Sequence, residues 1–144
     1  MQEEKHIEAL KEVKRLIDIA MRDPDGLLPW QRVIMTVLSL GVQNLVEIWL
    51  HRSTAIKPSA TIKHEWFSSE DRKLRLKMSG VLTKDFRKLK NADAILSLAR
   101  EIEKDRNSIV YGSPLINDSV IREKLDVFLE LKKSVESVSG DIQW

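Results

Sequence analysis

Apolar residues recur every three or four positions over four long segments of the chain, which is the spacing of one face of an α-helix. In the first segment the repeat runs from Ile7 to Met21 and stops at the sequence DPDG, residues 23–26. The second begins near Pro29, a residue suited to a first helical turn, and continues to Arg52 with apolar residues around most of its circumference. We therefore expect an amphipathic outer helix followed by a central helix that is packed on several sides.

Two further helices are predicted in the second half of the chain. The third runs from about Asp93 to Tyr111 and is ended by the sequence GSP at 112–114. The fourth follows a cap region of Asn, Asp and Ser at 117–119 and places apolar residues from 121 to 138 on one face. No segment alternates with the period of a β-strand, so an all-α class is expected.

Residues 53–92 depart from the helical pattern and are expected to form a partly irregular insert between the second and third long helices. Short helices are expected within it near 69–78 and 83–89. The predicted architecture is an antiparallel bundle of four to five helices with this insert, in a single domain covering residues 1–144.

The charge of the whole chain is nearly balanced, but one segment is strongly basic. The chain carries 24 Lys and Arg against 22 Asp and Glu, but residues 57–90 hold ten basic residues against four acidic ones. Such an insert can track a phosphate backbone while aromatic rings stack on bases, although a solvated surface and packing aromatics are the simpler alternatives. The candidate RNA-binding residues are Lys63, His64, Trp66, Arg72, Lys73, Arg75 and Lys77.

Several classes of site are not expected. The chain has no cysteine, and its three histidines, His6, His51 and His64, lie far apart in sequence, so neither a metal site nor a cofactor is predicted. The start, MQEEKHIEAL, lacks the apolar core of a signal peptide, and the apolar stretch 33–50 is interrupted by polar residues. These features favour a soluble cytoplasmic protein with no membrane segment.

Arg106 occupies a position of the third predicted helix at which the apolar repeat predicts an aliphatic residue. An arginine that is partly buried needs a carboxylate or a phosphate to accept its hydrogen bonds. On the predicted central helix, Glu47 is the single acid in a polar seam that also holds Asn44 and His51. We therefore expect Glu47 to accept from Arg106, with Asn44 and His51 beside it. Such a pair can be purely structural, or it can mark a functional site.

The sequence DRNSIVYG around Arg106 resembles the HEPN superfamily, helical-bundle proteins of prokaryotic toxin–antitoxin and defence systems. The surrounding IKHEWF and AREIEKDRNSIVYGSP look like a small archaeal branch of that superfamily, and the resemblance covers roughly residues 29–138. It implies a helical bundle, metal-independent RNA cleavage in active members, and an active site that commonly forms across a homodimer.

The signature of active members is an arginine, often followed by a polar residue, then a histidine four to six residues beyond. Arg106 and Asn107 match its first half, but Tyr111 stands where the histidine is expected. A phenol, with a pKa of about 10, is a poor base at neutral pH, whereas an imidazole is mostly free base there. His51 is an alternative source of an imidazole. The candidate catalytic residues are Arg106, Asn107, Tyr111, His51, Glu47 and Asn44.

Three functions follow as hypotheses. The first is an RNA-associated protein that binds RNA with weak or no nuclease activity. The second is a metal-independent endoribonuclease that uses Arg106 with His51 or Tyr111. The third is a non-catalytic interaction module that pairs with a small nucleotidyltransferase, as the resemblance allows. The broad apolar surface of the second helix favours a homodimer in each case.

Overall fold

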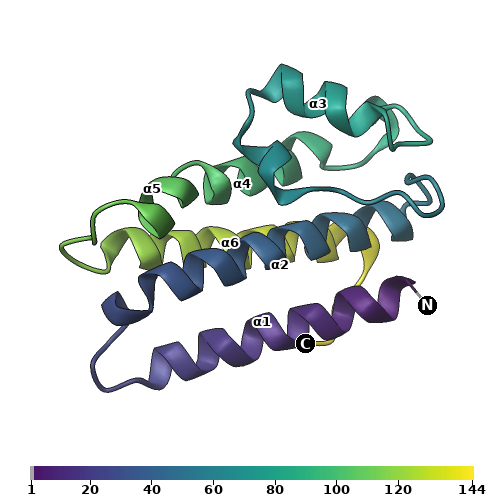
Figure 1. The fold of residues 1–144 in the computed structure, drawn as a ribbon. Helices are drawn as coiled ribbons and strands as arrows, with labels where there is room; N and C mark the ends of the chain where they lie inside the picture. Colours follow the sequence, from purple (N-terminus) through teal and green to yellow (C-terminus); the bar gives the residue numbers. More distant parts are fainter. Residues whose placement is uncertain (1) are drawn as a thin grey trace.

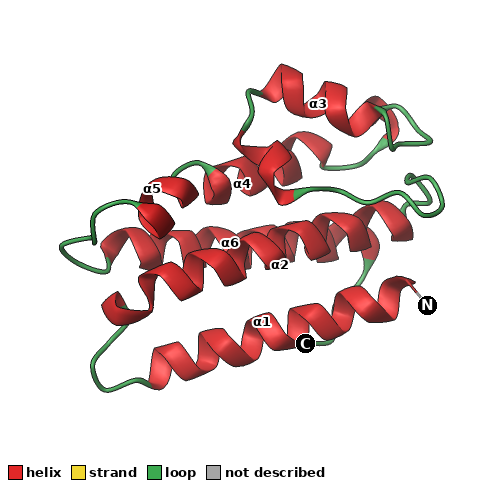
Figure 2. Cartoon of the chain, viewed as in Figure 1, coloured by secondary structure: helices red, strands yellow, loops and turns green. Residues whose placement is uncertain are grey.

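The computed structural model describes residues 2–144, and they confirm the all-α prediction, with no β-strand among them (Figure 2). The α-helices are α1 (Gln2–Arg22), α2 (Gln31–Arg52), α3 (Asp71–Ser79), α4 (Ala92–Glu103), α5 (Arg106–Tyr111) and α6 (Ser119–Ser139). Short 3₁₀ turns occupy η1 (Leu28–Trp30), η2 (His64–Ser68) and η3 (Phe86–Lys88). The bounds of α1, α2 and α6 agree closely with the periodicity of the sequence.

Helix α2 is the centre of the bundle and contacts α1, α4, α5 and α6. Long helices that follow one another in the chain run antiparallel, whereas α2 and α6 run in the same direction side by side (Figure 1). The segment Leu28–Arg52 is long and apolar enough to cross a bilayer by length and composition, but 78% of its most apolar stretch is buried inside the bundle. Packing within one chain therefore accounts for most of the apolar circumference of α2.

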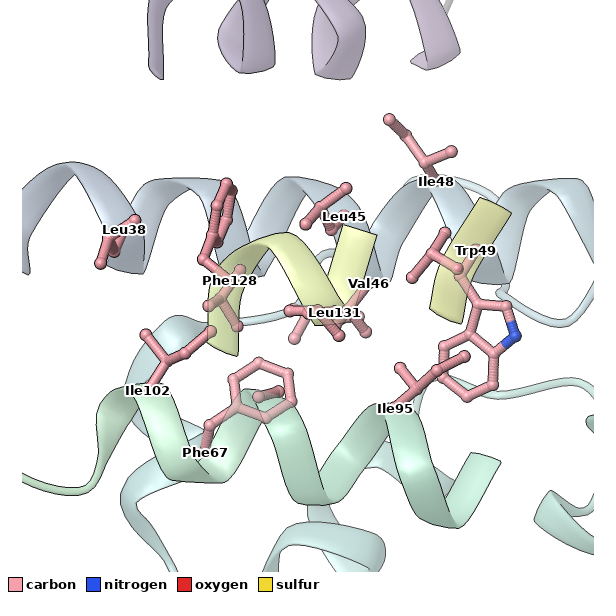
Figure 3. Close-up of a cluster of buried hydrophobic side chains, with 14 of the residues drawn as sticks. Leu38, Leu45, Val46, Ile48, Trp49, Phe67, Ile95, Ile102, Phe128 and Leu131 are labelled. Carbon is pink, nitrogen blue, oxygen red and sulfur yellow. The ribbon is translucent and has the colours of Figure 1, made fainter. Parts of the chain in front are cut away.

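The core is built from aromatic and aliphatic side chains of several elements. Trp49 of α2, Phe128 of α6 and Phe67 of the insert are fully buried, and Figure 3 shows Phe67 directed toward the interior beside α4. Helices α2 and α6 approach closely at Gly41, because a Cβ atom there would lie 2.5 Å from the Phe128 ring. The insert is thus fastened to the bundle by an aromatic side chain of its own.

The third predicted helix is not continuous. It divides into α4 and α5 at Lys104 and Asp105, so the prediction of a single helix over 93–111 is wrong. The buried Lys124 of α6 donates to the carbonyl of Glu101, and its ammonium lies 3.6 Å from the Asp105 carboxylate. The charged sequence EKDR leaves no apolar side chain to hold the turn, and Lys124 satisfies the end of α4 instead.

The insert is only partly helical, as predicted. Its α3 confirms the helix expected near 69–78, but the segment 83–89 forms only the single turn η3, where the Asp85 carboxylate accepts from the backbone amide of Arg87. One isolated β-bridge joins Ile56 to Leu82. In Figure 1 the insert lies over α4 and the end of α2, on the side of the bundle away from α1.

Candidate functional site

Polar side chains inside the bundle form two clusters that share α2. The first, the His6 cluster, consists of His6, Asn44, Glu47 and His51. The second, the Arg106 cluster, consists of Ser39, His64, Glu103 and Arg106.

The His6 cluster is held by hydrogen bonds from three elements. Glu47 Oε1 accepts from the backbone amide of Ile62 at 2.7 Å, and Glu47 Oε2 lies 2.9 Å from His6 Nε2. His6 Nδ1 donates to Asn44 Oδ1 at 2.7 Å, and the Asn44 amide donates to the carbonyl of Leu40. The cluster therefore joins α1, α2 and the extended part of the insert.

His6 is buried, yet both of its ring nitrogens face acceptors. Burial opposes the charged imidazolium, but hydrogen bonding to Glu47 and Asn44 and the negative charges of Glu47 and Glu3 outweigh it and raise the pKa of His6. The His51 ring stacks on the His6 ring with a centroid separation of 5.5 Å. The three groups His6, Glu47 and His51 thus face one another at the end of α2.

The predicted pair of Arg106 and Glu47 does not form. Both oxygens of Glu47 are engaged with His6 and Ile62, while the Arg106 guanidinium donates to Asn107 Oδ1 at 3.2 Å. Asn44 and His51 do lie beside Glu47, as expected, but the group that faces the Glu47 carboxylate is the imidazole of His6. The prediction was wrong because the helix break redirects the chain that carries Arg106.

Arg106 belongs instead to a cluster around Glu103, whose side chain is almost completely buried. His64 Nδ1 lies 3.5 Å from Glu103 Oε2, and the His64 side chain is 32% exposed. Burial raises the pKa of Glu103. The Ser39 hydroxyl and the charges of His64 and Arg106 act in the opposite direction, but their effect is smaller, so the pKa remains raised. The buried Glu103 carboxyl group therefore lies next to the half-buried Arg106 and the partly exposed His64.

The polar atoms of this cluster are poorly satisfied. Of the five buried side-chain polar atoms without a well-aligned hydrogen bond among the described residues, four belong to it: Ser39 Oγ, His64 Nδ1, Glu103 Oε1 and Arg106 Nε. Buried polar groups in proteins are nearly always hydrogen-bonded, so a group of exceptions calls for an explanation. Of these groups, the Arg106 guanidinium and the His64 imidazole can donate to an acceptor such as a phosphate oxygen, and neither side chain is fully buried.

The other candidate catalytic residues lie apart from Glu103. His51 belongs to the His6 cluster, so it is not the imidazole that accompanies Arg106. Tyr111 ends α5 with 77% of its surface exposed. Asn107 is exposed and serves as the acceptor of the Arg106 guanidinium. The structure therefore puts His64, predicted only as a base-stacking residue, in the place expected for His51.

The predicted RNA-binding residues differ in their freedom to bind. The side chains of Lys63, Arg72 and Lys73 are exposed and make no hydrogen bond or ion pair among the described residues, and the Lys77 ammonium donates only to the Ser69 hydroxyl. Arg75 is committed to Asp71 and Asp93 and lies over the Phe86 ring. Trp66 is half-buried against the core, so packing is its main role.

Sequence reasoning did not include His6, Ser39 or Glu103 among the candidate site residues, although Ser39 lies on the polar seam of the central helix. A signal for two of them was available. His6 lies four residues before Leu10 and therefore on the apolar face of the first helix. Glu103 lies four residues after Ala99 and therefore on the apolar face of the third predicted helix. Polar residues on an apolar stripe therefore marked both clusters.

No known protein family, characterised protein or solved structure matches the chain.

Proposed function

We propose that this protein is an RNA-associated protein of the HEPN type that binds single-stranded RNA through the Arg106 cluster and the basic insert. The observation that carries the proposal is the group of buried polar atoms without a well-aligned hydrogen bond around Glu103, flanked by Arg106 and the partly exposed His64. A phosphate is the complementary ligand for a guanidinium and an imidazole that stand at a surface.

The basic insert extends this site. Lys63 directly precedes His64, and Arg72 and Lys73 offer further unpaired cations on α3. Each phosphate that such cations neutralise releases counterions, so affinity should fall with salt. The contribution of Arg75 should be small, because its guanidinium already has two carboxylate partners.

Metal-independent cleavage at the same site is the second candidate, and the position of His64 favours it. In this step His64 takes the proton of the ribose 2′-hydroxyl, the 2′-oxygen attacks phosphorus, and the bond to the 5′-oxygen breaks with a proton taken from solvent. Arg106 neutralises the charge that develops on the phosphate. The products are a 2′,3′-cyclic phosphate and a 5′-hydroxyl.

Binding is tested by fluorescence anisotropy with a labelled single-stranded RNA at several salt concentrations. We expect Arg106→Ala to weaken affinity about tenfold and to lower the salt slope by about 1. Arg87→Ala is the matched control, because Arg87 is an insert arginine that is already paired with Asp85 and should change binding little. A flat salt slope, or equal affinity for Arg106→Ala and the wild type, would remove the proposal.

Cleavage is tested by incubating the same RNA with protein in EDTA and analysing the product ends. Cyclic phosphate ends that disappear in both His64→Ala and Arg106→Ala, and persist in His51→Ala, support the nuclease. Intact RNA together with normal binding leaves the binding function alone. Absence of both activities, with capture of a nucleotidyltransferase from the native host, would favour the interaction module.

A further inference from the structure

We propose that His6, Glu47 and His51 form a binding site for a divalent transition-metal ion, with zinc as the suited metal. Each of these residues offers one ligand atom, and the three atoms all lie within 4.8 Å of one another. Two imidazoles and one carboxylate are a ligand set of zinc sites that keep a fourth position for water. This inference does not depend on the proposed RNA function.

The surroundings orient the ligands as metal sites require. Histidine ligands usually donate their second ring N–H to an oxygen, which fixes the ring and its tautomer. Here Asn44 Oδ1 accepts from His6 Nδ1, and the backbone amide of Ile62 holds Glu47 Oε1. His6 Nε2 and Glu47 Oε2 are left facing each other, and Nε2 is buried without a well-aligned hydrogen bond.

Admitting an ion requires the ligand atoms to move by between about half an ångström and about 1.4 Å, because they lie within 4.8 Å of one another and not at the spacing of a zinc site. Ligand atoms about 2.1 Å from a tetrahedral zinc ion lie about 3.4 Å from one another. His6 Nε2 and Glu47 Oε2 are 2.9 Å apart, so they must separate by about half an ångström as the proton between them leaves. His51 is partly exposed in the last turn of α2 and gives the ion a path from solvent.

The nearby cation does not compete for the site. Arg52 is engaged with the Glu3 carboxylate and with the carbonyls of Ser139, Gly140 and Asp141. Imidazole nitrogens favour zinc, copper and nickel, whereas magnesium and calcium prefer a full set of oxygen ligands. The chemistry of the ligands therefore selects a transition metal.

The test is calorimetric titration of zinc chloride into the tag-free full chain after chelator treatment and dialysis, at pH 7.5. We expect one ion per chain at micromolar affinity or better, and cobalt(II) should give visible absorption typical of a tetrahedral site. His51→Ala should weaken affinity at least tenfold. Because His51 is partly exposed, this variant is expected to fold, and circular dichroism checks that it does.

Two further variants sharpen the result. Asn44→Ala should weaken zinc binding about tenfold, because it frees the His6 ring without removing a ligand. His64→Ala is the matched control, since it removes the histidine beside Glu103 and should leave binding unchanged. No binding at tenfold excess zinc, or equal affinity in His51→Ala and the wild type, would overturn the proposal.

Discussion

Glu103 shows how a single buried carboxyl group makes stability depend on pH. Burial raises its pKa in the folded chain, so the folded state favours the neutral form more than the unfolded state does. Below about pH 4.3, the pKa of a glutamic acid in the unfolded chain, Glu103 is protonated in both states and its burial costs no ionisation energy. As the pH rises through the higher pKa of the folded state, this contribution to the free energy of unfolding is lost. Glu103 therefore costs stability at neutral pH.

We predict that Glu103→Gln raises the free energy of unfolding at pH 7.5 and leaves it nearly unchanged at pH 4. Urea unfolding at the two pH values measures the difference. Glu101→Gln, on the exposed face of the same helix, is the control for removing a negative charge. If the free energy of unfolding changes by the same amount in Glu103→Gln and in the wild type between pH 4 and pH 7.5, burial does not raise the pKa of this carboxyl group.

At this scale the sequence predicted which residue types matter better than which residues meet. Arg106, Glu47, Asn44 and His51 were all found as polar residues on apolar faces, and three of them do lie together. The partner of Arg106 was assigned wrongly, because a helical periodicity carried through Lys104 and Asp105 ignores the break there. Contacts between elements are set by such breaks, which local spacing does not encode.

At the scale of elements, α2 and α6 pack tightly where Gly41 on α2 meets the Phe128 ring on α6. We predict that Gly41→Ala destabilises the protein by about 1–3 kcal/mol, because the new methyl group would overlap a buried ring. This outweighs the gain of about 1 kcal/mol that alanine brings to a helix interior. Denaturant unfolding measures the change.

The control for this variant is Gly80→Ala at the end of α3, where the added methyl group has its nearest neighbour at 3.4 Å. Its stability should differ from the wild type by less than about 1 kcal/mol. Phe128→Leu should cost less in the Gly41→Ala background than in the wild type, since it removes the overlap. Additive costs in the double variant would contradict a contact between the two positions.

Helix positions were predictable because apolar spacing, the DPDG turn and the Asn117 cap region are local signals. Helix α6 does begin in this region: Asn117 Oδ1 accepts from the backbone amide and hydroxyl of Ser119, whereas the side chain of the N-cap residue Asp118 makes no capping hydrogen bond. The insert was less predictable. Its fastening depends on Phe67 entering a core that distant helices build, and no local pattern records that.

On the scale of the whole molecule, the C-terminal segment closes one side of the bundle. Trp144 packs on Phe128 at a ring separation of 5.8 Å, lies under the Lys132 ammonium, and lines an apolar groove between α1 and α6. Arg52 binds the carbonyls of the same segment. The segment is thus held at both of its ends.

We predict that Trp144→Ala lowers the free energy of unfolding by about 1 kcal/mol, because a half-buried aromatic side chain loses its contacts. Thermal and urea unfolding measure this, and increased binding of a hydrophobic dye should report the widened groove. Trp144→Phe should recover most of the loss. An unchanged unfolding midpoint in Trp144→Ala would show that the ring adds nothing to the bundle.

The division between α4 and α5 has a consequence for how this surface could change over generations. The direction of the Arg106 side chain is set by a two-residue joint that Lys124 clamps, and not by the axis of α4. The position of the guanidinium therefore depends on Lys124 of α6 remaining next to the end of α4. A one-residue insertion between α4 and α5 would shift Arg106 along the chain relative to this clamp and separate its side chain from Glu103, so the site would be lost in a single mutation.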